Sequence, residues 1–238
     1  MYFAYFVYFV YFVISKIKSK IYGIMQKWQF DNKYFEKPFT AALLGSTKSG
    51  KTTFLNYLIP KIAHNFDFIL FFSTNNHADV YKPIVSLPNV ISYDRFFSKP
   101  VATLFSNNKM NNNEFNTLVL IDDEVNSKNN PVIKNLFSVM RNSGFSTIYS
   151  GQNYTFVSKE NRNNLNYVYI FKQNNNSSME DVYKIFLKGN LPVQYTDKRK
   201  FAQMAQDLEF VKKYTFDHNF IVLDILNDYK IYSYKVQL

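Results

Sequence analysis

The sequence contains no cysteine among its 238 residues. This absence excludes disulfide bonds and cysteine-based metal sites, and it fits a protein of a reducing intracellular compartment. Histidine is scarce as well, because only His64, His77 and His218 occur, far apart and without metal-ligand spacing. We expect a surface or core role for each of them. No acidic cluster typical of a nuclease stands out, so the sequence does not favour nuclease activity.

Acidic residues are outnumbered, with 18 Asp and Glu against 28 Lys and Arg, which gives a formal net charge of +10. A basic balance favours polyanionic partners such as nucleic acids, because Lys and Arg release counterions when they contact phosphates. A gene rich in A and T would also raise the lysine content, because Lys shares A/T-rich codons with Asn, Ile, Phe and Tyr. Composition alone leaves both explanations open.

A long hydrophobic run is also missing. The first fourteen residues, MYFAYFVYFVYFVI, are apolar and repeat the unit YFV, but a transmembrane helix needs about 20 apolar residues. The charge pattern and cleavage site of a signal peptide are absent. A short membrane or interface anchor, an aromatic tail and an upstream extension before Met25 remain as explanations. We favour the extension over membrane contact through residues 1–14, which divides the chain into residues 1–24 and one domain over residues 25–238.

From about Phe39 onward, apolar runs alternate with helical segments, which predicts an α/β fold with a mostly parallel central sheet covered by helices on both faces. Residues 220–225 and 229–234 predict a C-terminal β-hairpin at the sheet edge. Pro60 should kink or shorten the first helix, and the Asn-rich patches 107–116 and 173–176 are expected to be loops. The expected strands are 39–44, 67–72, 89–93, 118–121, 146–150 and 167–171, and the expected helices are 51–65 and 131–140.

One segment matches the Walker A motif G-x-x-x-x-G-K-[ST] at every fixed position, between a predicted strand and a predicted helix. The two glycines allow a tight turn close to phosphates, and the loop N–H groups with the helix N-terminus face the anion. Lys51 would contact the β- and γ-phosphates of ATP, and Thr52 would offer its hydroxyl to Mg²⁺. The predicted ATP-binding residues are Gly45, Ser46, Thr47, Lys48, Ser49, Gly50, Lys51, Thr52 and Thr53.

The run Leu118-Val-Leu-Ile-Asp-Asp-Glu124 has the form of a Walker B motif, an apolar strand that ends in acids. Asp122 is expected at the strand end beside the Walker A loop, where it would hold a Mg²⁺-bound water. Asp123 or Glu124 would orient the attacking water. Strand alternation points Asp123 away from Asp122 unless the strand has ended, so both acids stay open, with Asp123 favoured as the immediate neighbour.

Three further polar residues are candidates for catalysis. Gln152 follows the strand 146–150 and could hydrogen-bond the γ-phosphate or the attacking water, although an ordinary loop role would also explain it. Arg141 and Arg162 could each act as an arginine finger that reaches the ATP of a neighbouring subunit. Pairing of Arg141 with its own helix C-terminus, and a salt bridge or DNA contact for Arg162, are the alternatives.

The order of these motifs resembles the FtsK–HerA superfamily of P-loop NTPases. Within it, the chain is most similar to the genome-packaging ATPases of poxviruses, other large DNA viruses, virophages and polinton-like elements. The resemblance covers nearly the whole chain after the N-terminal tail. Asn142 stands where the family often has His, which weakens the assignment of Arg141 as the finger. The matching segments are 45–52, 118–123, 141–142, 150–152 and 162–163.

The resemblance implies an ATPase with Mg²⁺ as cofactor that moves double-stranded DNA into a preformed capsid. It also implies a homo-oligomeric ring, Arg141 as the trans-acting finger, a capsid vertex or portal-like partner, and a place in the host cytoplasm, a viral factory or the virion. A membrane-linked plasmid or conjugative DNA-transfer ATPase of the same superfamily is the alternative. DNA contacts would come from core loops, with Lys128, Lys134, Lys198, Arg199 and Lys200 as candidates, although a solvated face explains these residues equally well.

Overall fold

The structure, a computed structural model, describes residues 25–36, 38–123, 130–152, 158–188, 190–191 and 200–235. The N-terminal segment 1–24, with its three possible explanations, lies outside the described residues, as do Glu124, Lys128, Lys198 and Arg199. In the described part of the chain, no helix is long and apolar enough to cross a membrane.

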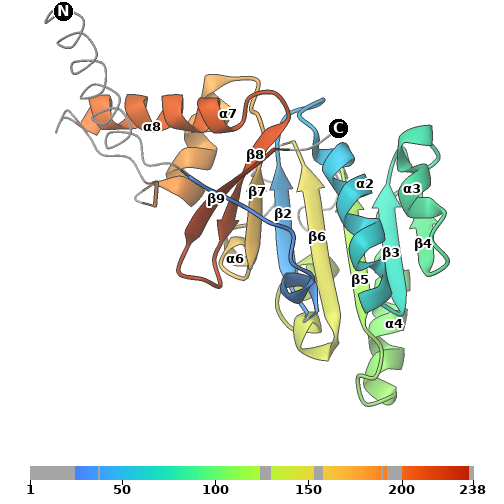
Figure 1. Ribbon diagram of the computed structural model, residues 1–238. Coiled ribbons are helices and arrows are strands. Elements are labelled where there is room, and N and C mark those ends of the chain that lie inside the picture. The colour runs from blue at the N-terminus through green and yellow to red at the C-terminus, as the bar shows by residue number, and fades with distance from the viewer. Residues whose placement is uncertain are drawn as a thin grey trace, which may run out of the picture.

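The described residues form a nine-stranded sheet with the order β1-β9-β8-β7-β2-β6-β5-β3-β4 (Figure 1). The strands from β7 to β4 along this order run parallel, and β8 and β9 form an antiparallel hairpin beside β7. The predicted sheet type and hairpin are therefore confirmed. The strands are β1 (Gln26–Lys27), β2 (Thr40–Leu44), β3 (Phe68–Ser73), β4 (Val90–Tyr93), β5 (Thr117–Asp122), β6 (Phe145–Gly151), β7 (Tyr167–Ile170), β8 (Asn219–Asp224) and β9 (Lys230–Lys235).

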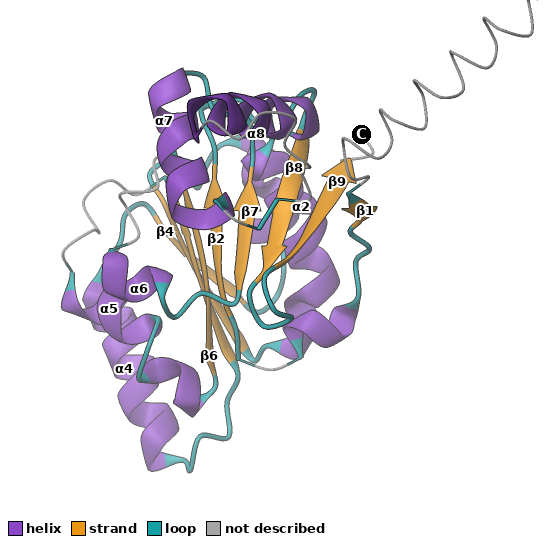
Figure 2. Cartoon of the chain, turned by 90° about the vertical axis from the view of Figure 1, so that its left-hand side faces the viewer, coloured by secondary structure: helices purple, strands orange, loops and turns teal. Residues whose placement is uncertain are grey.

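Helices lie on both faces of this sheet (Figures 1 and 2). The α-helices are α2 (Lys51–Ile62), α3 (Lys82–Val85), α4 (Ser98–Met110), α5 (Pro131–Leu136), α6 (Lys159–Arg162), α7 (Asn176–Val182) and α8 (Lys200–Tyr214). Shorter 3₁₀ turns are η1 (Asn32–Phe35), η2 (Ala63–Asn65), η3 (Asp79–Tyr81) and η5 (Met140–Ser143), and a π-helical turn, η7 (Tyr183–Leu187), extends α7.

Two hydrophobic cores result from the alternation of side chains along the strands. In β2, Ala41 and Leu43 pack with Phe54 and Leu58 of α2 on one face. Ala42 and Leu44 face the other core, which α4, α5, α7 and α8 cover. Burial on both faces explains why the central strands consist of continuous apolar runs.

The structure corrects several expected boundaries. The first helix ends at Ile62, soon after Pro60, and continues only as the 3₁₀ turn η2. The second ends at Leu136 rather than residue 140. The Asn-rich patch 107–116 is not all loop, because α4 extends to Met110. Asn108 is buried there and its amide donates to the carbonyls of Phe115 and Ser143, so this asparagine is a structural residue of the helix.

Candidate functional site

The Walker A loop connects β2 to α2 at the carboxyl edge of the parallel strands. Gly45 leaves no room for a side chain, since a Cβ there would lie 2.5 Å from Cβ of Phe171. Gly50 is the N-cap of α2 with φ of 104°, a left-handed conformation that favours glycine. The backbone of the segment after β7 fixes the loop, because Ser46 N donates to Lys172 O at 3.0 Å and Asn174 N donates to Ser46 Oγ at 2.7 Å.

Lys51 is buried inside this loop, with 5% of its surface exposed. Its ammonium group donates to the carbonyl oxygens of Gly45 at 2.7 Å and Ser46 at 3.1 Å. Burial lowers the pKa of Lys51 from its ordinary value, and the nearby carboxylates of Asp123 and Asp122 oppose that shift. The loop therefore holds a cation beside two carboxylates.

Asp122 and Asp123 adopt different positions because β5 ends between them. Asp122 is its last residue and is only 1% exposed. Asp123 has φ of 51°, so the chain leaves the strand geometry and this side chain lines the same cavity as the Walker A loop. The alternation that would have pointed Asp123 away therefore does not apply. Burial raises the pKa of Asp122, and nearby Ser150, Tyr81 and Lys51 oppose that shift.

Tyr81 was not predicted from the sequence, although it contacts the acidic strand end directly. Its hydroxyl donates to Asp122 Oδ2 at 2.5 Å, and both side chains are buried. Burial raises the pKa of Tyr81, and the charge of Asp122 raises it further. No local motif indicates Tyr81, because it comes from η3, 41 residues before Asp122.

His218 is a second residue that no sequence motif places at this site. It belongs to the turn between α8 and β8, where Asp217 and His218 both have left-handed backbones. Its Nδ1 lies 3.2 Å from where a Cβ on Gly50 would be, and the ring lines the Walker A cavity. His218 is exposed, which agrees with the expected surface role, and it lies beside the Walker A loop because antiparallel β8 brings the start of that strand to the carboxyl edge.

Most of these residues line one cavity of about 440 Å³. Its size lies within the range that small-molecule and cofactor sites occupy. Four of the predicted site residues do not line this cavity: Gly45, Ser46, Asp122 and Gln152. Gln152 is exposed, but it lies near the loop because it follows Gly151, whose carbonyl accepts from Gly45 N at 3.2 Å. The lining residues are Thr47, Lys48, Ser49, Gly50, Lys51, Thr52, Thr53, Asn75, Ala78, Val80, Tyr81, Asp123 and His218.

The two candidate arginines lie at the opposite, amino edge of the sheet. Arg141 belongs to η5, which ends just before β6 begins. Since β6 spans residues 145–151, at about 3.3 Å per residue Arg141 is on the order of 20 Å from the Walker A loop. Arg162 ends α6, close to the amino end of β2, and shares a pocket with Lys159 and Lys188.

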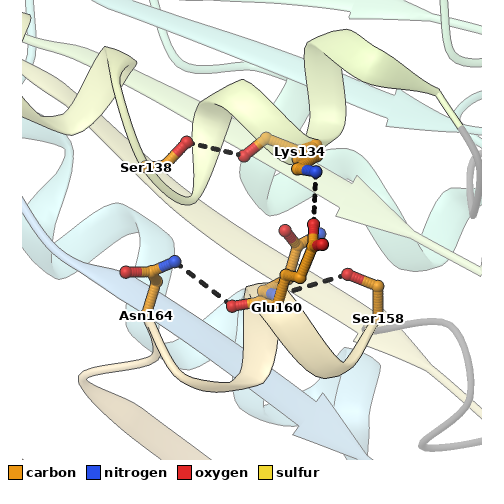
Figure 3. Close-up of polar contacts among 6 residues, drawn as sticks. Lys134, Ser138, Ser158, Glu160 and Asn164 are labelled. Atoms are coloured by element: carbon orange, nitrogen blue, oxygen red, sulfur yellow. Dashed lines mark hydrogen bonds and ion pairs between the residues drawn. The ribbon is translucent and has the colours of Figure 1, made fainter.

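Lys134, one of the candidate DNA contacts, forms an ion pair with Glu160 (Figure 3). The pair joins α5 to α6. Ser158 caps α6 by accepting from Asn161 N, and Asn164 donates to Glu160 O at its end. Lys134 therefore has a structural partner, whereas Lys200 begins α8 and its side chain is not described.

The fold and the site together define a P-loop NTPase: a Walker A loop after a buried parallel strand, and a Walker B aspartate two strands away with β6 between them. The chain belongs to the poxvirus A32 protein family, whose model matches residues 26–224. This match confirms the predicted resemblance to poxvirus genome-packaging ATPases.

Solved structures of viral and bacterial ATPases share the fold. The genome packaging NTPase B204 of Sulfolobus turreted icosahedral virus 2, in complex with AMP, has a TM-score of 0.58 at 19% identity, covering 85% of this chain and 99% of that one. B204 of Sulfolobus turreted icosahedral virus, a DNA-packaging ATPase, has a TM-score of 0.58 at 15% identity, covering 85% and 100%. EssC (ATPases 2 and 3) from Geobacillus thermodenitrificans has a TM-score of 0.51 at 14% identity, covering 75% and 44%. No curated protein matches the chain in sequence.

Proposed function

We propose that this chain is an ATP-driven translocase that packages double-stranded viral DNA into a preformed capsid. Its membership of the A32 family supports this function. The main structural support for it is that Lys51, Thr52 and Asp123 line the same cavity. These residues supply a cation, a hydroxyl and a carboxylate, the groups that phosphoryl transfer to water requires.

The loop fits the triphosphate of ATP. Gly45 and Gly50 allow the tight turn of the loop, and the residues from Thr47 to Thr53, which line the cavity, would surround the phosphates. Ser49 Oγ is buried without a hydrogen-bond partner among the described residues, so it is available to a ligand. Lys51 would exchange its bonds to the loop carbonyls for the β- and γ-phosphates, where its charge offsets the charge of the transferred group.

The chain also fits a Mg²⁺ ion that is shared with the nucleotide. Thr52 lines the cavity, and Asp122 Oδ1 is buried without a hydrogen-bond partner in the described part of the chain. The described residues contain no cluster of three or more His, Cys, Asp or Glu, so phosphate oxygens and water would complete the coordination. We assign Thr52 and Asp122 to this ion, which would neutralise charge on the β- and γ-phosphates.

Hydrolysis needs a group that orients the attacking water, and we assign this role to Asp123. Asp123 reaches the cavity, and Glu124 lies outside the described residues. Gln152, directly after Gly151 at the carboxyl end of β6, is our candidate for contact with the γ-phosphate or the water.

The arginine finger would come from a second copy of the chain. Arg141 lies at the other edge of the sheet, so it does not serve the Walker A loop of its own chain. We therefore propose a homo-oligomeric ring in which Arg141 completes the neighbouring site, with Arg162 as the second candidate. A capsid vertex or portal-like component would anchor this ring, and the host cytoplasm, a viral factory or the virion is the proposed location.

ATP turnover with and without double-stranded DNA at low salt tests this function. We expect DNA to stimulate hydrolysis by the full chain, and the stimulation to fall as salt rises because phosphate contacts release counterions. The net charge of +10 supports this expectation. ATP turnover that ignores DNA at every salt concentration would contradict the packaging function.

A further inference from the structure

The hydrogen bond between Tyr81 and Asp122 is a contact of the site that has no assigned role so far. Asp122 is buried at the end of β5, and its two oxygens differ in their surroundings. Oδ2 accepts the Tyr81 hydroxyl at 2.5 Å, whereas Oδ1 has no hydrogen-bond partner among the described residues. Tyr81 therefore fixes one oxygen of this carboxylate and leaves the other available.

We propose that Tyr81 is a positioning residue for the Mg²⁺ end of the site: its hydroxyl orients the Asp122 carboxylate so that the second oxygen serves the metal. This inference rests on the proposed ATPase function. Groups that hydrogen-bond to a metal-binding carboxylate set its orientation, and their loss weakens metal affinity. A charge-assisted hydrogen bond of 2.5 Å is suited to this role.

Tyr81 is itself held in place from several sides. Its ring packs against Phe71 of β3, with ring centroids 5.1 Å apart. Its backbone N donates to Ala78 O at 2.9 Å. Asn56 of α2 donates to the carbonyl of the adjacent Val80 at 2.6 Å. The helix that begins with Lys51 and Thr52 therefore also fixes the turn that carries Tyr81, which couples the Walker A helix to Asp122.

The chain contains a matched control for this contact. Tyr183 of η7 donates to Asp207 Oδ2 of α8, also at 2.5 Å, and both of these side chains are buried. Neither residue lines the Walker A cavity. A Tyr→Phe change at each position removes one hydroxyl from a buried tyrosine–aspartate pair, but only one of the two pairs adjoins the proposed metal site.

The experiment compares Tyr81→Phe, Tyr183→Phe and the unchanged full chain. Binding of a fluorescent ATP analogue is measured in EDTA and then over a Mg²⁺ titration, together with the melting temperature. We expect Tyr81→Phe to bind the analogue normally in EDTA but to need about tenfold more Mg²⁺ for the half-maximal metal-dependent change. Tyr183→Phe should keep the normal Mg²⁺ midpoint, even if its melting temperature falls.

An unchanged Mg²⁺ midpoint in Tyr81→Phe, or a lower one, would overturn the proposal. A lower midpoint would mean that the hydroxyl obstructs the metal. If Tyr81→Phe does not fold, Asn56→Ala, which releases the turn at Val80, should raise the midpoint by a smaller factor, and an unchanged value there would count against the proposal. An unchanged chain that binds no ATP analogue in either condition would instead overturn the ATPase function, and this inference with it.

Discussion

At the carboxyl edge of the central strands, Lys51, Asp122 and Tyr81 are buried and contact one another or the Walker A loop. At the amino edge, Arg141 and Arg162 are only half-buried, and the ion pair between Lys134 and Glu160 is largely exposed. The buried charged groups at the carboxyl edge can bind and polarise a phosphate group, because charges interact strongly where water is excluded. The more exposed charged groups at the amino edge are suited to contacts with another molecule. Substitutions at the two edges test this division.

Replacement of Lys51 should have the largest effect. We expect Lys51→Ala to abolish ATP turnover, because the change removes the buried cation from the phosphate loop. Steady-state phosphate release measures this loss. Lys61→Ala is the matched control, since Lys61 lies on the same helix but is exposed, and its turnover should be normal. Residual turnover near the normal rate in Lys51→Ala would contradict the site assignment.

Replacement of Arg141 tests whether the amino edge takes part in catalysis. An arginine finger contributes about 10³-fold or more to turnover. We therefore expect Arg141→Ala to lose about that factor in the assembled oligomer, while the affinity for ATP is unchanged. Addition of Lys51→Ala subunits, which keep Arg141, should restore part of the turnover in mixed oligomers. No recovery on mixing, at any ratio, would argue against a finger supplied by a neighbour.

Replacement of Asp123 separates binding from hydrolysis. Positioned acids and bases contribute about 10²–10⁴-fold to a reaction, so Asp123→Asn should slow turnover by about that factor with normal ATP binding. Single-turnover hydrolysis and equilibrium binding measure the two steps separately. If Glu124→Gln slows hydrolysis and Asp123→Asn does not, the roles that we give these two acids are reversed.

The smallest effect is expected at the ion pair of the amino edge. The side chains of Lys134 and Glu160 are 59% and 66% exposed, and exposed pairs contribute about 0–1 kcal/mol to stability. Glu160→Gln should therefore lower the free energy of unfolding by less than about 1 kcal/mol and leave basal ATP turnover unchanged. Urea denaturation measures the first quantity. A large loss of stability would show that this edge is more tightly coupled than its exposure indicates.

The sequence predicted the features that are local. The Walker A loop and the buried strands were predictable because the glycine spacing and the continuous apolar runs lie within short segments. The position of Asp123 depends on where β5 ends. Side-chain alternation along a strand does not predict the left-handed backbone that Asp123 adopts there. Helix α4 was missed because its Asn-rich end resembles a loop, although Asn108 is buried there.

Features that depend on topology were not predictable in this way. Tyr81 meets Asp122, and His218 meets Gly50, only because the strand order brings distant loops to one edge of the sheet. The topology separates Arg141 from the Walker A loop, because a helix and a turn between β5 and β6 place this arginine at the far edge. Its distance from the Walker A loop follows from the direction of β6 rather than from any motif.

Displacement of a third strand from a DNA triplex tests whether the chain moves along double-stranded DNA. A translocase that tracks along double-stranded DNA strips such a strand from the duplex, and its release can be followed by fluorescence. We expect release with ATP, and no release with a non-hydrolysable analogue or with Lys51→Ala. DNA-stimulated ATP hydrolysis by the full chain without any strand release would contradict a translocating motor.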